Sequence, residues 1–351
     1  MTSLLQYTRS WMSTVLSSMK IRIGSKTLGD GEPTLIIAEA GLNHDGKLAQ
    51  AKKLIQYAAE AGADAIKFQI YTAEELCSSN SALFALFKSM EFSEDQWLEL
   101  ADYAKNYEIM FTASVFGPAS ADLLGNIGSP MFKIASGDIT YLQLLSYVGK
   151  KARPIVLSTG MSTLSEIEDA LNEIYGAGMR SVMLMHCVST YPTAYEDANL
   201  KVIKTLKCAF GLPVGFSDHT EGTLVPVVAV ALGANAIEKH ITPDRTLPGP
   251  DHTLSLEPAE FKSMVERIRF AEQALGDGIK KPTVAEREMS DQARRFITAN
   301  TEITAGTAIT RDMIKIVRSS PAIEPKFVNL ITGRTAKRTI AKDQAISWLD
   351  V

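Results

Sequence analysis

Two histidines that each close a short apolar run are the first residues in this chain whose type and position could do chemistry. His219 follows VGFSD and His240 follows AIEK. If the two runs are neighbouring β-strands, which lie about 4.8 Å apart, both imidazoles could bind one divalent ion. Two imidazole ligands would leave the other positions of the ion to oxygen ligands, water or a substrate. Two histidines that only form hydrogen bonds are the alternative.

Lysines inside the apolar runs form a second candidate group. Lys67 lies in AIKFQI and Lys133 in MFKIAS, where a buried amine requires a compensating charge. An anionic substrate with a phosphate and a carboxylate is one explanation, and a lysine that forms a Schiff base is another. An ion pair with Glu39 or Glu238 is the third. Serines that close three of the runs fit contacts with phosphate oxygens: Ser114, Ser136 and Ser217.

Eight apolar runs rich in Ile and Val would have to position these side chains. They occupy residues 34–40, 65–70, 109–114, 131–136, 154–159, 181–187, 213–217 and 236–240. Near-continuous apolar strands are typical of a parallel sheet buried on both faces, and amphipathic helical patterns separate the runs. Eight such units predict an α/β fold, the (β/α)8 or TIM barrel. In this barrel the active site lies at the carboxyl ends of the strands.

The chain of 351 residues is longer than one barrel of roughly 250 residues requires. We predict an N-terminal extension at 1–18, a catalytic barrel at 19–275, a charged linker at 276–294 and a small β-rich domain at 295–351. The extension contains no acidic residue, and a targeting segment or an upstream start would both explain it. The last domain is too small for a comfortably stable core, so we expect it to pack on a second subunit.

Composition excludes several classes of protein. A formal net charge of −4 argues against nucleic-acid binding, which usually requires a clustered basic face. The three cysteines form no CxxC pair, which is typical of reduced thiols in the cytoplasm. No apolar run reaches the ~18–20 residues that a membrane span needs. We therefore expect a cytoplasmic protein that binds neither nucleic acid nor membrane.

The motifs, read in order, resemble the sialic acid synthase family, which includes N-acetylneuraminate, legionaminate and pseudaminate synthases. They are IIAEAGLNHDG, AIKFQ, FKIASGD, IVLSTGMS, YPTAYED, VGFSDHT, EKH and PGPDH. The likeness runs from about Met19 into the C-terminal domain, which resembles the antifreeze-like (SAF, β-clip) domain. It implies that phosphoenolpyruvate condenses with an N-acylated amino-sugar aldehyde and water. The aldehyde would be N-acetylmannosamine or a 2,4-diacetamido-6-deoxy sugar, and the products a nine-carbon 2-keto acid and phosphate.

The resemblance also implies roles for residues of this sequence. His219 and His240 would bind the metal, Mn²⁺ foremost, with Mg²⁺ or Co²⁺ as alternatives, and both would be catalytic together with Glu39 and Asp138. Asp138 stands where the family commonly has an acid that handles the attacking water, but it is one methylene shorter than Glu. Phosphoenolpyruvate would be bound by Lys67, Ser114, Lys133, Ser136, Ser189, Ser217 and Arg294. The sugar would be bound by Glu39, Gln69, Tyr191, Asp251 and Arg318.

Two positions qualify this resemblance. Some members have Asn two residues before the Tyr-Pro pair, whereas this chain has Ser189, so a contact to phosphoenolpyruvate there would use a hydroxyl. Arg318 matches an arginine that the family's C-terminal domain inserts into the partner's barrel. The resemblance therefore implies a domain-swapped homodimer. We expect the insertion after Ile70 to contact the far end of the sugar and so to determine which sugar is accepted.

Three other functions remain open on the sequence. A barrel synthase that uses phosphoenolpyruvate and a phosphorylated sugar is the nearest, although those enzymes lack the C-terminal module. A Schiff-base aldolase would use Lys67. A non-catalytic sugar-binding protein with an SAF domain should have lost site residues, and the main ones are all present.

Overall fold

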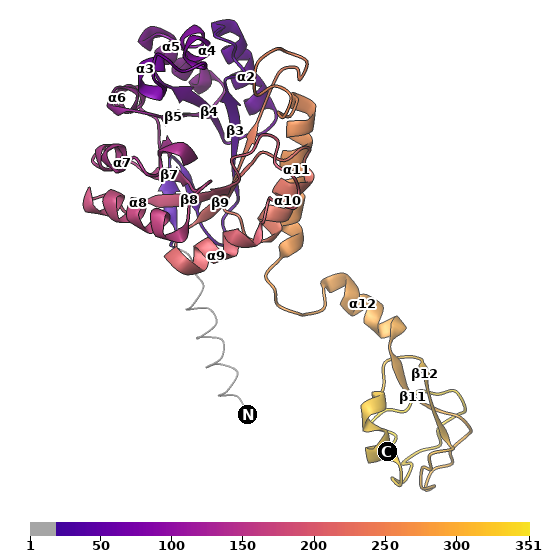
Figure 1. Cartoon of the computed structure of the whole chain (residues 1–351). Helices are drawn as coiled ribbons and strands as arrows, with labels where there is room; N and C mark the ends of the chain where they lie inside the picture. Colours follow the sequence, from indigo (N-terminus) through magenta and orange to yellow (C-terminus); the bar gives the residue numbers. More distant parts are fainter. Residues whose placement is uncertain (1–18) are drawn as a thin grey trace. The chain divides into compact units, whose positions relative to one another are not determined.

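The computed structural model describes residues 19–351, so the extension predicted at 1–18 lies outside the described residues. Two compact units divide the chain, one ending at Gly276 and the other covering Asp277–Val351. Both are shown in Figure 1, and each is described here by itself.

Eight parallel strands close into a barrel in the order β10-β3-β4-β5-β6-β7-β8-β9, so the predicted TIM barrel is confirmed. Each strand overlaps one of the predicted apolar runs. The strands are β3 (Leu35–Gly41), β4 (Ala65–Ile70), β5 (Met110–Val115), β6 (Phe132–Ile134), β7 (Ile155–Ser158), β8 (Val182–Cys187), β9 (Val214–Asp218) and β10 (Ala236–His240).

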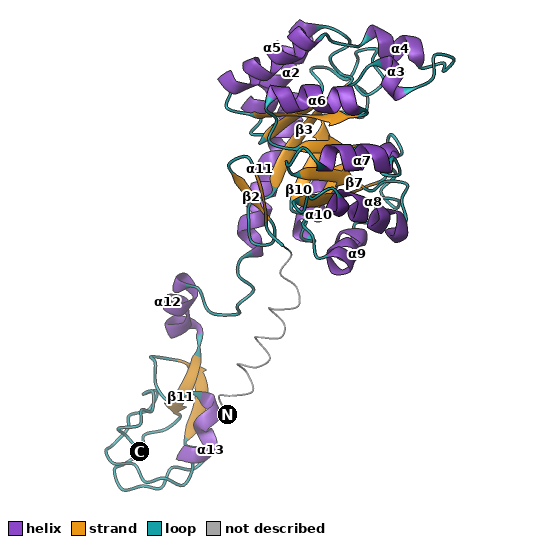
Figure 2. Ribbon diagram, turned by 90° about the vertical axis from the view of Figure 1, so that its left-hand side faces the viewer, coloured by secondary structure: helices purple, strands orange, loops and turns teal. Residues whose placement is uncertain are grey.

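Helices cover the outside of the strands, as both views of the barrel show (Figures 1 and 2). Their buried faces and the outward residues of the strands, such as Ile36 and Phe68, form the main core. This core explains why the strands read as continuous apolar runs, because both of their faces are buried. The helices are α2 (Leu48–Glu60), α5 (Glu94–Asn106), α6 (Pro118–Ile127), α7 (Leu142–Gly149), α8 (Leu164–Gly176), α9 (Lys201–Phe210), α10 (Leu224–Ala231) and α11 (Pro258–Leu275).

A short hairpin of β1 (Ile21–Ile23) and β2 (Lys26–Leu28) belongs to the barrel unit and was not predicted. Ile21, Ile23 and Leu28 pack into a second apolar cluster with inward residues near the amino ends of the strands, among them Leu35 and Ile37. The hairpin therefore fills the amino-terminal end of the barrel and leaves the carboxyl ends for the active site.

The insertion after β4 contains two short helices, α3 (Ala73–Leu76) and α4 (Phe84–Ser89). It packs through its own small apolar cluster, which includes Tyr71 and Met90 together with Leu42 from the loop after β3. The insertion is thus attached to the same face of the barrel as the strand ends.

The second unit has an apolar core of its own, built around residues such as Ile297, Ile309 and Ile340. Its regular strands, β11 (Arg295–Ala299) and β12 (Ile314–Arg318), pair antiparallel. The 3-10 turn η2 (Pro325–Phe327) and the short helix α13 (Val328–Ile331) follow. Isolated bridges join further extended segments, so the predicted small β-rich domain is confirmed.

Helix α12 (Val284–Ala293) occupies most of the segment predicted as a linker. None of its residues is buried, so it has no apolar face whose period could be read from the sequence. Its local signal is the capping box of Thr283 and Glu286. Within residues 19–351, no helix combines the length and apolar character that crossing a membrane would require.

Candidate active site

A cavity of about 430 Å³ opens at the carboxyl ends of the strands, and every one of the eight strands or its following loop contributes to its wall. Most of the residues predicted to act on substrate line it. They are Glu39, Lys67, Gln69, Ser114, Lys133, Ser136, Ser189, Tyr191, Ser217, His219, His240 and Asp251. Parallel strands in a barrel carry their carboxyl ends to one face, which is how residues so far apart in the sequence meet.

Two lysines and two glutamates form the floor of this cavity. Lys133 Nζ donates to both carboxylate oxygens of Glu238, at 2.8 and 2.9 Å. Lys67 Nζ lies 3.0 Å from Glu39 Oε2 and 3.4 Å from Glu238 Oε1. All four side chains are buried. The ion-pair explanation for the lysines therefore holds, and both amines also line the cavity.

Electrostatics distinguish the two glutamates. Burial raises the pKa of Glu39 to about 7, against the opposing effect of Lys67. Burial would also raise the pKa of Glu238, but Lys133 and Lys67 outweigh it and hold that pKa well below its usual range. Glu238 is thus a permanent carboxylate, whereas Glu39 can exchange a proton near neutral pH.

Glu238 was predicted only as an ion-pair partner, not as a site residue, yet it contacts both lysines and the hydroxyl of Ser217 at 2.8 Å. The signal was its position two residues before His240, because alternate residues of a strand face the same side.

The contacts with Glu238 and Glu39 also shift the pKa of Lys67. Burial lowers the pKa of Lys67, but Glu238 and Glu39 outweigh burial and raise it. A Schiff base forms from the neutral amine, so a raised pKa at Lys67 disfavours the aldolase alternative.

Hydroxyl groups surround a narrow recess beside the lysines. Ser136 Oγ accepts the Gly160 N–H at 3.0 Å and lies 3.0 Å from Cys187 Sγ. A Cβ at position 160 would come within 2.4 Å of Ser189 Oγ and 2.8 Å of Ser136 Oγ, so only glycine fits there. Ser114 accepts a hydrogen bond from Lys67 at 3.2 Å. This recess offers donors of the kind that bind phosphate or carboxylate oxygens.

His219 and His240 face each other across the rim, with ring centroids 5.6 Å apart. Burial lowers the pKa of His219 to about 4 and that of His240 to about 3, so both rings are neutral at pH 7. His219 Nδ1 lies 2.7 Å from the Val188 carbonyl and therefore carries the proton, which leaves Nε2 with a lone pair.

Among the described residues, the buried Nδ1 of His240 has no hydrogen-bond partner, and it lies 3.8 Å from Asp251 Oδ2. Two neutral imidazoles, one with an unsatisfied nitrogen, fit a divalent ion. Within 19–351, no group of three or more His, Cys, Asp and Glu side chains could hold a metal ion by itself. Water and substrate would therefore supply the remaining ligands of an ion held by these two histidines.

Tyr191, Asp251 and Gln69 lie around the histidines. The Tyr191 ring is 4.1 Å from that of His219 and 6.2 Å from that of His240. Gln69 Nε2 is 3.5 Å from Glu39 Oε1. Gly41, with φ of +49°, leaves room for Asp251, since a Cβ there would lie 2.8 Å from its Oδ2. These groups offer donors and acceptors to a polyhydroxylated ligand beside the imidazoles.

Three predicted site residues do not line the cavity. Asp138 lies in the 3-10 turn η1 (Ser136–Asp138), and although its neighbours Ser136 and Gly137 reach the cavity, Asp138 is absent from its wall. Burial raises the pKa of Asp138 to about 6. Arg294 follows α12 and Arg318 ends β12, both exposed in the second unit, so their contacts with substrate stay predictions.

The remaining histidines have structural partners and do not line the cavity. His44 is buried against the rings of Phe92, Phe68 and Trp97. His186 Nε2 bonds the Ala198 carbonyl at 2.9 Å. His252 lies between Thr242 Oγ1 at 2.6 Å and Asp45 Oδ1 at 3.1 Å, and so anchors the loop that carries Asp251.

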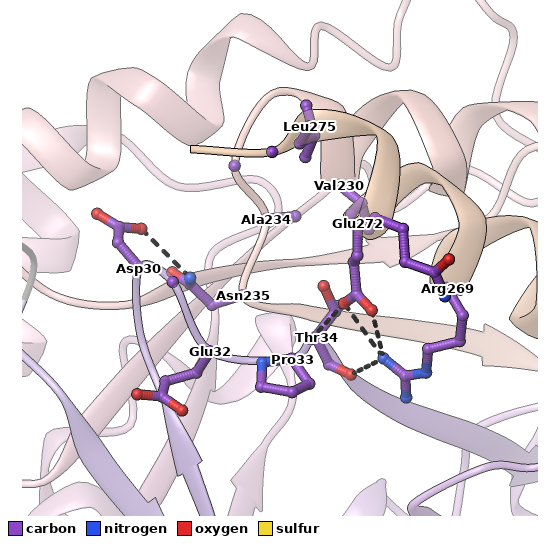
Figure 3. A pocket seen from close by; sticks show the side chains of 14 residues that line it. Asp30, Glu32, Pro33, Thr34, Val230, Ala234, Asn235, Arg269, Glu272 and Leu275 are labelled. Carbon is purple, nitrogen blue, oxygen red and sulfur yellow. Dashed lines mark hydrogen bonds and ion pairs between the residues drawn. The ribbon is translucent and has the colours of Figure 1, made fainter. Parts of the chain in front are cut away.

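A second cavity, of about 510 Å³, lies at the amino ends of β3 and β10 and is drawn in Figure 3. Its polar groups bond one another: Arg269 Nη1 donates to the Thr34 carbonyl at 2.9 Å, and Glu272 accepts the Thr34 N–H at 2.6 Å. Asn235 Nδ2 donates to Asp30 at 3.3 Å. These pairings tie the loop before β3 to α11 and β10, which is a structural arrangement rather than a catalytic one.

Comparison with known proteins gives two family matches. The model described as the NeuB family matches residues 54–280, and that described as the SAF domain matches residues 294–351. The chain is 47% identical to an uncharacterized protein of Methanocaldococcus jannaschii, with 95% of this chain and 98% of the relative covered. It is 38% identical to the N,N'-diacetyllegionaminic acid synthase of Legionella pneumophila, again with 95% and 98% covered.

A solved structure is similar over most of the chain. The N-acetylneuraminic acid (sialic acid) synthetase from Leptospira borgpetersenii, in complex with citrate, superimposes with a TM-score of 0.75 at 40% identity. The likeness covers 78% of this chain and 96% of that one.

Proposed function

The chain belongs to the NeuB family and is an enzyme of the sialic acid synthase type, and from that premise we propose that it condenses phosphoenolpyruvate with an N-acylated amino-sugar aldehyde. C3 of phosphoenolpyruvate would form a bond to the aldehyde carbon, and water would add to C2. The bond between C2 and its phosphate oxygen would then break to release phosphate. The product is a nine-carbon 2-keto acid of the sialic acid type.

The single observation that carries this proposal is the juxtaposition of an anion-binding floor with two neutral imidazoles in one cavity. Lys67 and Lys133 would bind the phosphate and carboxylate of phosphoenolpyruvate, and Ser114, Ser136, Ser189 and Ser217 would donate to their oxygens. The lysines also stabilise the negative charge that grows on the departing phosphate. A divalent ion held by His219 and His240, Mn²⁺ foremost, would polarise the sugar aldehyde.

Glu39 is the carboxylate best suited to exchange a proton with the reacting groups. It lines the cavity, its Oε2 lies 3.0 Å from Lys67 Nζ, and burial raises its pKa to about 7. A general base acts best with a pKa near the working pH. Asp138, which the family resemblance assigned to the attacking water, lies outside the cavity wall. We therefore assign the main proton transfer to Glu39.

The wall of the cavity also favours a class of sugar. Among the described residues that line it, the lysine and arginine side chains are Lys67 and Lys133, both on the floor, and the two histidines are neutral at pH 7. A phosphorylated sugar would need a further cation that the barrel itself does not provide. Leu42 and Met161 add apolar surface suited to acetamido or 6-deoxy methyl groups. N-acetylmannosamine and a 2,4-diacetamido-6-deoxy sugar both fit this description.

The C-terminal unit completes the proposal. Its SAF domain carries Arg318 at the exposed end of β12, and we propose that this side chain enters the barrel of a partner subunit in a domain-swapped homodimer. Arg294 would contact the anionic substrate. Both assignments come from the family resemblance.

Phosphate release from phosphoenolpyruvate tests the proposal. The full chain is incubated with N-acetylmannosamine, a 2,4-diacetamido-6-deoxy sugar or arabinose 5-phosphate, each with and without EDTA. We expect release with one of the amino sugars and its loss on chelation, reversed by Mn²⁺. Release with none of the sugars would contradict the activity, release with arabinose 5-phosphate alone would indicate the phosphorylated-sugar class, and activity that survives chelation would contradict the metal.

A further inference from the structure

The last residues of β9 and β10 pair in register, and the pairing sorts them onto opposite faces. Glu238 opposes Ser217 and Lys239 opposes Asp218. The first pair faces the cavity, where Ser217 donates to Glu238 at 2.8 Å. Because alternate residues of a strand point to opposite sides, the second pair faces outward, and the following residues, His219 and His240, return to the cavity.

Asp218 and Lys239 form an ion pair that is shielded from water. Their Oδ2 and Nζ atoms lie 2.7 Å apart, and the exposed fractions of the two side chains are 0% and 1%. Lys239 Nζ also donates to the Thr220 carbonyl, and Asp218 Oδ1 accepts the Thr220 N–H at 2.9 Å. The network therefore holds Asp218 and Thr220, the residues on either side of His219, and links them to Lys239, the residue before His240.

The local geometry makes this network a clamp on the two histidines. The bond from the Thr220 N–H to the Asp218 side chain closes a turn of the Asx type, with His219 as its central residue. Lys239 fixes the same carboxylate from the neighbouring strand. The backbone at His219 can then shift relative to His240 only if a buried, charged hydrogen bond breaks.

Stability alone does not account for an ion pair at this position. Burying two charges costs desolvation energy, and apolar side chains of similar volume are often as stabilising. Apolar residues would not bond the Thr220 backbone, however. Groups outside the ligand shell that fix the position of metal-binding histidines commonly influence ion affinity, and this pair fixes the backbone beside them.

We propose that Asp218 and Lys239 are positioning residues that hold His219 and His240 at the separation a shared divalent ion requires. The inference rests on the metal assignment in the proposed function. It goes beyond that assignment by locating the determinant of ion affinity in a charged pair outside the cavity. Neither residue touches substrate or ion in this proposal.

The test measures Mn²⁺ binding to the full chain without substrates, from the electron paramagnetic resonance signal of free Mn²⁺. The double variant D218N/K239M removes both charges, so no unpaired charge is buried, and the amide oxygen that it introduces can still accept the Thr220 N–H. We expect the dissociation constant for Mn²⁺ to rise about 10- to 100-fold. The Mn²⁺ concentration for half-maximal activity should rise in parallel, with kcat recovering at saturating Mn²⁺. A loss of folded protein would lower kcat without that recovery.

Asp64→Asn is the matched control at the amino ends of the strands. Asp64 Oδ2 accepts the Ile36 N–H at 2.8 Å and lies 3.3 Å from Arg269 Nη2, so it too joins a backbone amide to a cationic side chain, here a partly buried one. We expect this variant to melt earlier while binding Mn²⁺ as the unaltered protein does. Lys239→Arg, which keeps both charges and changes only the shape of the donor, replaces the double variant if that fails to fold.

Unchanged Mn²⁺ affinity in a folded pair variant would overturn the inference, and so would equal weakening in the Asp64→Asn control. His219→Ala separates this failure from that of the metal assignment. If the unaltered protein binds no Mn²⁺, or if His219→Ala binds it equally well, the metal assignment itself is wrong and the inference falls with it.

Discussion

Lys133 holds Glu238 through two hydrogen bonds of 2.8 and 2.9 Å, with both side chains buried at the floor of the barrel. Glu238 also bonds Ser217 and lies 3.4 Å from Lys67. The carboxylate thus orients three groups that we assign to phosphoenolpyruvate. Preorganised charges of this kind stabilise a developing negative charge without first having to rearrange.

Removing the ammonium from this floor should harm both folding and catalysis. Lys133→Met leaves the buried Glu238 with a weaker counter-charge, and breaking a buried pair in this way costs about 3–5 kcal/mol. We expect a matching fall in the free energy of unfolding in urea and a large rise in the KM for phosphoenolpyruvate. Lys151→Met, which removes a surface pair with Asp122, is the control and should change neither. An unaltered KM in a folded Lys133→Met protein would contradict the anion-binding role.

The proton-transfer role of Glu39 predicts a pH effect on the rate. Burial raises the pKa of Glu39 to about 7, and only the ionised carboxylate can accept a proton, so kcat/KM should rise with pH through about 7. In Glu39→Gln, this rise of kcat/KM with pH should disappear, and the rate should fall by about 10²–10⁴-fold. Asp138→Asn serves as the comparison: its kcat/KM should still rise with pH through about 7, and its rate should fall less. If Asp138→Asn instead loses the pH dependence and the larger part of the rate, the main proton transfer belongs to Asp138.

His44 predicts a pH effect on stability that is separate from catalysis. Its Nδ1 accepts the Gly46 N–H at 3.1 Å, and burial lowers its pKa from the usual 6.5 to about 4. Between pH 6.5 and pH 4, His44 is largely protonated in the unfolded chain but neutral in the folded protein. The free energy of unfolding therefore falls as pH decreases from 6.5 to 4. The slope from one such group reaches about 1.4 kcal/mol per pH unit.

His44→Gln isolates this contribution, because the other titrating groups are common to both proteins. The difference in unfolding free energy between the unaltered protein and the variant should fall as pH decreases through this window and stay constant above it. Parallel stability curves for the two proteins would show that folding does not lower the pKa of His44.

The domain-swapped dimer predicts complementation between two inactive chains. Arg318→Ala should reduce turnover or sugar affinity while leaving the barrel folded, and His240→Ala should be inactive for a different reason. In a mixed dimer, the intact barrel of the Arg318→Ala chain would receive Arg318 from its partner. Co-refolding the two at equal amounts should restore about a quarter of full activity by random pairing. Unaltered kinetics in Arg318→Ala, or no recovery on mixing, would argue against the swap.

Local pattern was sufficient to predict the barrel and much of its site. Each strand is a short apolar run buried on both faces, so periodicity revealed all eight, and Lys67, Lys133, His219 and His240 stood out as polar residues within or ending such runs. Their convergence follows from the rule that parallel strands bring their carboxyl ends to one face. Helix α12 escaped prediction because, with no buried residue, it has no apolar period.

What the tertiary structure alone decided is which charges meet. Glu238 and Lys239 are neighbours in the sequence, yet the first joins Lys133 inside the barrel and the second joins Asp218 outside it. Asp138 follows Ser136 by two residues but does not share its cavity. The sequence by itself determined the residue types and the strands that carry them. The partners depended on barrel closure and register, because both arise from contacts between segments that are distant along the chain.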